Sequence, residues 1–115
     1  MKPALLLLAG SALLAGCQPQ DALTVHGGDP ITYLCDQQAK VTVRYFSLSD
    51  DSLHFVKLTL PDGTPYTLPQ VVSASGARFS DLQQLVWWNK GDGGFVEQLD
   101  DDGEWQILLD NCREE

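Results

Sequence analysis

Basic side chains are scarce in this chain of 115 residues. Lys and Arg together number 7 against 16 Asp and Glu, which gives a net charge of −9 at pH 7. Nucleic-acid binding needs clusters of Lys or Arg against the phosphates, so this balance argues against DNA and RNA as partners. An acidic surface suits a basic protein partner, because opposite charges steer association, although acidity also serves solubility alone.

Residues typical of catalysis and metal binding are also few. The chain has two histidines, His26 and His54, and no C-x-x-C pair, so a zinc site is not expected. It lacks the G-x-S-x-G and S-x-x-K nucleophile motifs. The acids between Asp100 and Glu104 lack the EF-hand spacing for calcium. We therefore expect a protein that is not an enzyme and that holds no metal or other cofactor.

Long apolar runs are absent after the N-terminus. Residues 1–16 place one lysine before an uncharged apolar stretch that ends in small residues, which is the pattern of an export signal. The end of this stretch, Leu14-Ala15-Gly16-Cys17, resembles the lipobox of bacterial lipoproteins. That resemblance implies that the signal is removed before Cys17 and that this cysteine is acylated, which anchors a protein firmly. An ordinary secretory signal with a chance cysteine is the alternative.

The residues after Cys17 bear on location and domain organisation. In some bacteria an Asp after the lipid-bearing cysteine retains a lipoprotein in the inner membrane, so Gln18 favours the outer membrane, facing the periplasm. Removal of residues 1–16 takes away one lysine and no acid, so the mature charge becomes 6 − 16 = −10. Residues 17–30 are then the lipidated cysteine and a flexible linker rich in Pro, Gly and Gln, and residues 31–115 form one domain.

From residue 31 the pattern changes to short strands separated by turns. Val41, Val43 and Tyr45 alternate with Thr42 and Arg44, as on a half-buried strand. The expected strands are 31–36, 39–47, 53–60, one beginning at 66–68, 79–82, 85–88, 94–99 and 104–109. About eight such strands, without a convincing helix, predict an all-β domain: a small antiparallel β-barrel whose closure leaves no exposed edge. A β-sandwich is the alternative from the pattern alone.

Two cysteines remain for this domain. Cys35 lies in the first expected strand and Cys112 just after the last one. In an exported chain we expect them to form one disulfide that ties the two ends of the domain together. Two free buried thiols are the alternative.

The stretch from Ser73 to Gly91 has the composition of a presented site. Two turn-like segments, SASGAR and NKGDGG, flank a strand-like apolar run. Neighbours on a strand face opposite sides, so of Trp87 and Trp88 one is expected in the core and the other partly exposed near Lys90. The exposed one either contributes to a binding site or merely covers the barrel end. Arg78 is expected to hold its own loop through an acid, or else to reach a partner.

The motif S-x-S-G-A-R-F, followed by W-x-K-G, resembles the membrane-bound and periplasmic inhibitors of C-type lysozyme. Together with Y-x-C-D around Cys35 and the late Cys112, the resemblance covers about residues 31–113. It implies an eight-stranded antiparallel barrel. Phe79 departs from the family, which usually has Tyr at this position, so one hydroxyl is missing here.

C-type lysozymes cleave peptidoglycan with a glutamic acid and an aspartate. The resemblance implies that Ser75 and Lys90 enter the lysozyme cleft and bring a hydroxyl and an ammonium donor to these carboxyl groups. The candidate lysozyme-binding residues are Ser73, Ser75, Arg78, Trp88 and Lys90, and Ser73 is the alternative to Ser75 for the serine contact. We therefore expect a lipid-anchored inhibitor that protects peptidoglycan. An envelope lipoprotein with a structural role, or one that grips peptidoglycan or another protein, is the alternative.

Overall fold

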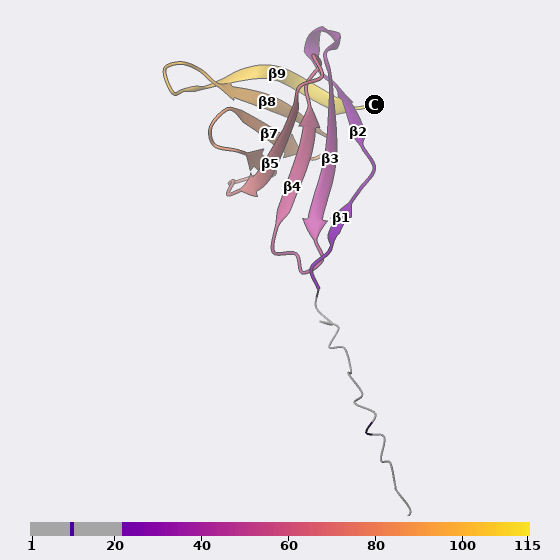
Figure 1. The fold of residues 1–115 in the computed structure, drawn as a ribbon. Helices are drawn as coiled ribbons and strands as arrows, with labels where there is room; N and C mark the ends of the chain where they lie inside the picture. Colours follow the sequence, from indigo (N-terminus) through magenta and orange to yellow (C-terminus); the bar gives the residue numbers. More distant parts are fainter. Residues whose placement is uncertain (1–9, 11–21) are drawn as a thin grey trace, which may run out of the picture.

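The computed structural model describes Gly10 and residues 22–115, and residues 25–114 carry the antiparallel β-strands (Figure 1). The strands are β1 (Val25–Gly27), β2 (Ile31–Leu34), β3 (Lys40–Leu48), β4 (His54–Thr59), β5 (Pro65–Val71), β6 (Ala77–Ser80), β7 (Leu85–Lys90), β8 (Gly93–Leu99) and β9 (Trp105–Glu114). A short 3-10 helix, η1 (Asp36–Gln38), joins β2 to β3. Apart from Gly10, the expected signal peptide lies outside the described residues, as does the lipobox cysteine Cys17. Within the described part, no helix has the length and apolar character needed to cross a membrane.

The strands close into a ring. Their order is β1-β3-β2-β9-β8-β7-β6-β5-β4, and an additional pairing of β3 with β4 completes the circle. Eight strands, β2 to β9, therefore form a closed antiparallel barrel, and β1 is an extra strand on β3. The predicted all-β barrel is confirmed, and the sandwich alternative is wrong.

Strand β1 lies within the stretch that the sequence predicted to be a flexible linker. Its three residues pair with residues 46–48 of β3. Two further bonds fix the stretch: the Gly28 N–H donates to the Tyr45 carbonyl at 2.9 Å, and the Thr24 N–H donates to Ser49 Oγ at 3.1 Å. The ordered structure thus begins before residue 31, because backbone pairing with a long neighbour stabilises a polar, Gly-rich segment that has no hydrophobic period of its own.

Alternate side chains of the strands fill the barrel interior. Val41 and Val43 on β3, like Val56 on β4, are fully buried, in agreement with the predicted alternation. Trp87 of β7 occupies the core, and its ring centroid lies 4.9 Å from that of Tyr33. Because neighbours on a strand point to opposite faces, Trp88, the next residue on β7, points out of the barrel.

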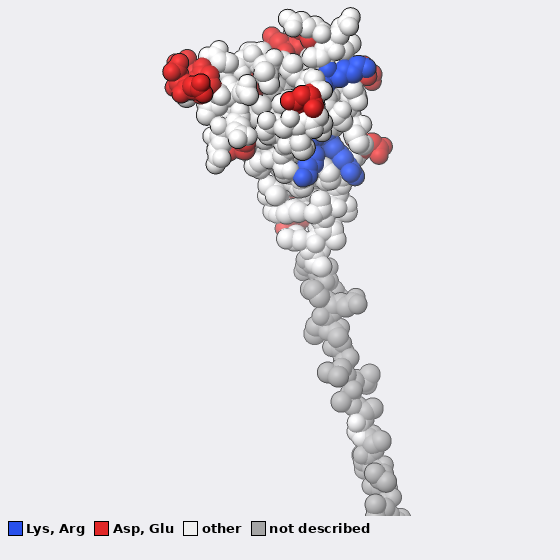
Figure 2. Space-filling view, turned by 45° about the horizontal axis from the view of Figure 1, so that its top comes forward, with Lys and Arg blue, Asp and Glu red and all other residues white. Residues whose placement is uncertain are grey.

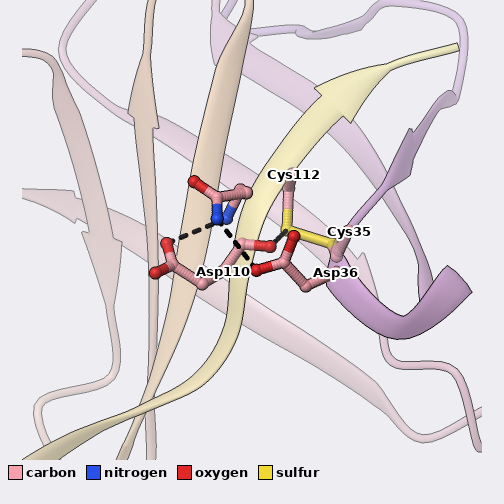
Figure 3. The surroundings of a disulfide bond; sticks show 5 residues. Cys35, Asp36, Asp110 and Cys112 are labelled. Atoms are coloured by element: carbon pink, nitrogen blue, oxygen red, sulfur yellow. Dashed lines mark hydrogen bonds between the residues drawn. A yellow bond between two sulfur atoms is a disulfide. The ribbon is translucent and has the colours of Figure 1, made fainter.

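The predicted disulfide between Cys35 and Cys112 is confirmed (Figure 3). Both half-cystines are buried. Cys112 lies inside β9 rather than after the last strand, because β9 continues five residues beyond the expected end at residue 109, to Glu114. Beside the bridge the Asn111 amide donates to Asp36 Oδ2 at 2.8 Å, so a polar contact joins the same two segments.

Candidate functional site

The residues of the predicted site lie in or beside two connections at one end of the barrel. Residues 72–76 join β5 to β6, and Gly91-Asp92 joins β7 to β8. Strands β6 and β7 are antiparallel neighbours in which Ala77 pairs with Asn89. The start of β6 therefore lies beside the end of β7, and the two connections meet.

The connection after β7 is tighter than the sequence predicted. The expected turn over residues 89–94 shrinks to two residues, because Asn89 pairs with Gly94 and Lys90 pairs with Gly93. Gly91 has a positive φ of 73°, as the first residue of a type II′ hairpin turn requires. Lys90 is thus the last residue of a strand, and the sheet itself fixes its backbone.

Gly76 allows the two connections to touch. Its φ is 65°, and a Cβ there would collide with the backbone carbonyl of Asn89 and lie 3.1 Å from Lys90 Cγ. Only glycine fits such a close approach without a shift of the neighbouring strand. This contact places Ser75 next to Lys90 in space although 15 positions separate them in the chain.

Hydrogen bonds hold the 72–76 loop in one shape. The Trp88 indole Nε1 donates to the Ser75 carbonyl at 2.9 Å. Ser73 Oγ donates to the Gly76 carbonyl at 3.0 Å. The Ser75 side chain is exposed, and its hydroxyl makes no hydrogen bond within residues 22–115. Ser73 therefore has a role inside the loop, and Ser75 is the serine that remains free to contact a partner.

Lys90 carries an exposed ammonium beside this loop. Lys90 Nζ lies 4.8 Å from the ring centroid of Trp88 and 5.8 Å from that of Phe95. The ion pairs of the described residues, Lys40–Glu115 and Arg113–Asp92, do not include it. An aromatic face rather than a carboxylate thus supports this cation, which leaves its charge available.

The expectation that Arg78 pairs with an acid of its own loop is wrong. No carboxylate of the described residues lies within ion-pair distance of its guanidinium. Arg78 Cζ instead lies 5.5 Å from the ring centroid of Trp88 and 6.0 Å from that of Trp105. The residues around it, on β7 and β9, present aromatic faces, so a cation–π contact replaces the salt bridge.

Trp88 is the centre of this arrangement. The two neighbours divide between core and surface as predicted, and Trp88 is the partly exposed member, on the outer face of β7. Its ring contacts the cations of Lys90 and Arg78 and lies 5.6 Å from the ring of Phe95, centroid to centroid. Because its indole N–H also holds the Ser75 carbonyl, one side chain supports both connections.

A hydroxyl network on the inner face of β7 fixes the strand from the other side, and no sequence pattern predicted it. The Tyr45 hydroxyl accepts from Asn89 Nδ2 at 2.7 Å and from Trp87 Nε1 at 2.9 Å. The Tyr33 hydroxyl lies 3.0 Å from it. Burial, together with this neighbouring hydroxyl, raises the pKa of Tyr33. The network keeps the end of β7, and hence Lys90, in register.

The barrel mouth beside the two connections is hollowed. A cavity of about 470 Å³ is lined by Tyr45, Phe46, His54, Gln70, Ala77, Phe79 and Asn89. Phe79 is buried, and its ring lies 5.9 Å from that of Tyr45, centroid to centroid, in an edge-to-face arrangement. Among the described residues, no group of three or more His, Cys, Asp or Glu side chains is placed to hold a metal ion.

Comparisons with known proteins agree with this architecture. Residues 33–105 match the family model of the membrane-bound lysozyme-inhibitor of c-type lysozyme. The chain is 34% identical over 110 residues to a membrane-bound lysozyme inhibitor of C-type lysozyme from Yersinia enterocolitica, covering 96% of this chain and 80% of that protein. It is 33% identical over 110 residues to the Escherichia coli protein of the same name, covering 95% and 90%.

A solved structure shares the fold. Pseudomonas aeruginosa MliC, crystallised in complex with hen egg white lysozyme, aligns with a TM-score of 0.57 and 24% sequence identity, over 82% of this chain and 85% of that one. The matched residues 33–105 include both connections of the candidate site, and the two relatives cover at least 95% of the chain; the chain therefore belongs to the family of membrane-bound inhibitors of C-type lysozyme.

Proposed function

We propose that this protein inhibits C-type lysozymes by inserting the 72–76 loop and the Lys90 turn into their active-site cleft. One observation carries the mechanism: the Ser75 hydroxyl and the Lys90 ammonium are exposed, adjacent and held on a common support. The family to which the chain belongs is named for inhibition of these enzymes, which supports a binding role rather than a catalytic one.

The chemistry of the cleft matches these two donors. C-type lysozymes use a protonated glutamic acid and an ionised aspartate that flank the scissile bond. An ammonium forms a charge-assisted hydrogen bond with a carboxylate, and a serine hydroxyl donates a second bond. The pre-ordered loop loses little conformational entropy on binding, so these contacts contribute to affinity almost in full.

A lysozyme activity assay with the purified protein tests the function directly. We expect stoichiometric loss of peptidoglycan cleavage when the protein is added to a C-type lysozyme. Full enzyme activity in the presence of excess protein would instead favour the alternative, an envelope protein with a structural or peptidoglycan-binding role.

Removal of the indole N–H of Trp88 is expected to loosen the Ser75 loop. Trp88→Phe keeps an aromatic face for Lys90 but deletes the donor to the Ser75 carbonyl, a bond worth roughly 0.5–1.5 kcal/mol. Affinity for lysozyme should fall by roughly 2- to 12-fold. Trp105→Phe makes the same chemical change on a ring that holds no loop, so it is the matched control. Equal affinities of the two variants, measured by calorimetry, would contradict this role.

Association with lysozyme is expected to slow as salt rises. The chain carries a net charge of −9, and C-type lysozymes are typically basic. Figure 2 shows acidic side chains gathered at the tip of the β8–β9 hairpin, around residues 100–104. Screening lengths fall from about 30 Å at 0.01 M salt to about 8 Å at 0.15 M, so a steered encounter should slow by roughly tenfold across this range. Stopped-flow mixing measures this rate, and a rate independent of salt would exclude steering.

We also propose that the protein is lipid-anchored through Cys17 and faces the periplasm from the outer membrane. The family name supports association with a membrane, and the lipobox-like Leu14-Ala15-Gly16-Cys17 supports a lipid anchor. Mass spectrometry of the membrane fraction should find a mature chain that begins at acylated Cys17. Recovery of an unmodified peptide that spans Ala15 to Gln18 from the mature protein would rule this out.

A further inference from the structure

Val72, in the proposed insertion loop, is the most exposed large apolar residue of the described chain. Its surface is 95% accessible, whereas the next such residue, Leu82, is 60% accessible. Val72 follows directly after Val71, which ends β5 and pairs with Arg78. A valine in this position contributes almost nothing to the barrel, since its side chain stays in water in the free protein.

The exposure of Val72 belongs to an ordered loop. The residue stands between the paired end of β5 and Ser73, whose hydroxyl bonds the Gly76 carbonyl at 3.0 Å. Trp88 holds the Ser75 carbonyl, and Gly76 contacts the Asn89 backbone. The loop therefore presents an apolar side chain at a fixed position, next to the exposed Ser75 hydroxyl.

We propose that Val72 is an apolar contact residue for lysozyme. Its side chain docks on an apolar wall of the lysozyme cleft, beside the catalytic carboxyl groups. This inference rests on the proposed function. The general acid of a C-type lysozyme sits in a hydrophobic pocket, which is what raises its pKa. An apolar side chain in the same loop as the polar donors can cover part of such a pocket without leaving a polar group unpaired.

The absence of charge in the 72–76 loop also fits its burial in the lysozyme cleft. Residues 72–76 carry no charged side chain, so their burial in a closed cleft requires no ion to be desolvated. Val72 supplies the apolar surface that is buried on binding, and Ser75 and Lys90 supply the directional polar contacts. The fully buried core of an interface is more apolar than its rim, so an exposed apolar side chain beside a few polar contacts fits such a position.

Titration calorimetry of the full chain in detergent against hen egg white lysozyme tests the inference. Val72→Ala removes two methyl groups and should weaken binding by roughly tenfold. Val72→Thr keeps the shape but adds a hydroxyl that must be desolvated, so it should weaken binding by at least about threefold. Melting temperatures should not change, because the side chain is exposed. Leu82→Ala, on the exposed residue of the β6–β7 connection at the other end of β6, is the matched control and should bind like the wild type.

The heat capacity of binding separates an apolar contact from an indirect effect. Burial of Val72 predicts a less negative heat-capacity change for Val72→Ala than for the wild type. Unchanged affinity of either Val72 variant, or weaker binding with an unchanged heat capacity, would overturn the inference. Lys90→Ala in the same experiment separates the two proposals: if it weakens binding and the Val72 variants do not, only the Val72 contact fails. If Lys90→Ala binds like the wild type, the insertion mechanism itself fails.

Discussion

Replacement of Lys90 by alanine is expected to weaken lysozyme inhibition by roughly 30- to several-thousand-fold. In the proposed complex the ammonium meets the catalytic carboxyl groups inside a closed cleft, where loss of one partner of a buried charge pair costs about 2–5 kcal/mol. In the free protein Lys90 is exposed and its cation rests over the Trp88 ring, a contact worth about 0.5–1 kcal/mol at such a site. The effect on binding should therefore far exceed the effect on stability.

Lys57→Ala is the matched control for this change. Lys57 is exposed on β4, carries the same charge and takes no part in the two connections of the site. Its removal alters the net charge equally and should cost less than about 1 kcal/mol of binding free energy. Inhibition constants from activity assays, with melting curves for each variant, measure both effects. Equal inhibition by the two variants would show that Lys90 does not enter the cleft.

Ser75→Ala should have a smaller effect in the same assay. It deletes a neutral donor to a charged acceptor, which is worth about 1.5–3 kcal/mol, or roughly 10- to 150-fold. The Ser75 and Lys90 side chains are neighbours, so the double variant should lose less than the sum of the two single losses if both meet the same carboxyl pair. If the losses of binding free energy in the two single variants simply add, the two donors contact separate groups on lysozyme.

The barrel could be predicted because its signals are local. Val41 and Val43 on β3, and Val56 and Leu58 on β4, each lie two residues apart, and their burial follows from that period. The same rule predicts that Trp87 and Trp88 lie on opposite faces, and the structure places Trp87 in the core. Strand β1 could not be predicted in this way, since residues 25–27 are fixed by backbone pairing with β3 and not by any hydrophobic period.

The sequence motif proposes candidate site residues but not their contacts. The motif around Ser75 and Lys90 points to two donors, but the contact of Gly76 with the Asn89 backbone depends on how β6 is aligned with β7. The same holds for Arg78, whose partners are rings on other strands. The exposure of Val72 had no sequence signal, because an apolar residue after a strand is expected to continue that strand, and its exposure is a property of the folded loop.

Loss of the Cys35–Cys112 disulfide is expected to cause the largest change in stability. The bridge closes a loop with a sequence separation of 77, for which the chain-entropy model gives roughly 4–4.7 kcal/mol, although measured values are often lower. It also lies beside one of the shortest seams of the barrel, because β2 and β9 pair only at Tyr33–Glu114 and Leu34–Arg113. Strands β8 and β9, by contrast, pair at six positions. The bridge thus reinforces a seam that few backbone hydrogen bonds hold.

Thermal unfolding with and without a reductant measures this contribution. A loss of about 4 kcal/mol corresponds to a fall in melting temperature on the order of 20 °C for a domain of this size. The double variant Cys35→Ala/Cys112→Ala should melt at a similarly low temperature, and reductant should not lower it further, which controls for other effects of the reductant. Because the β2–β9 seam opens first in this account, amide exchange in the reduced protein should rise earliest at residues 33–34 and 113–114. Equal melting temperatures of the reduced and the oxidised protein would show that backbone pairing and the core alone close the barrel.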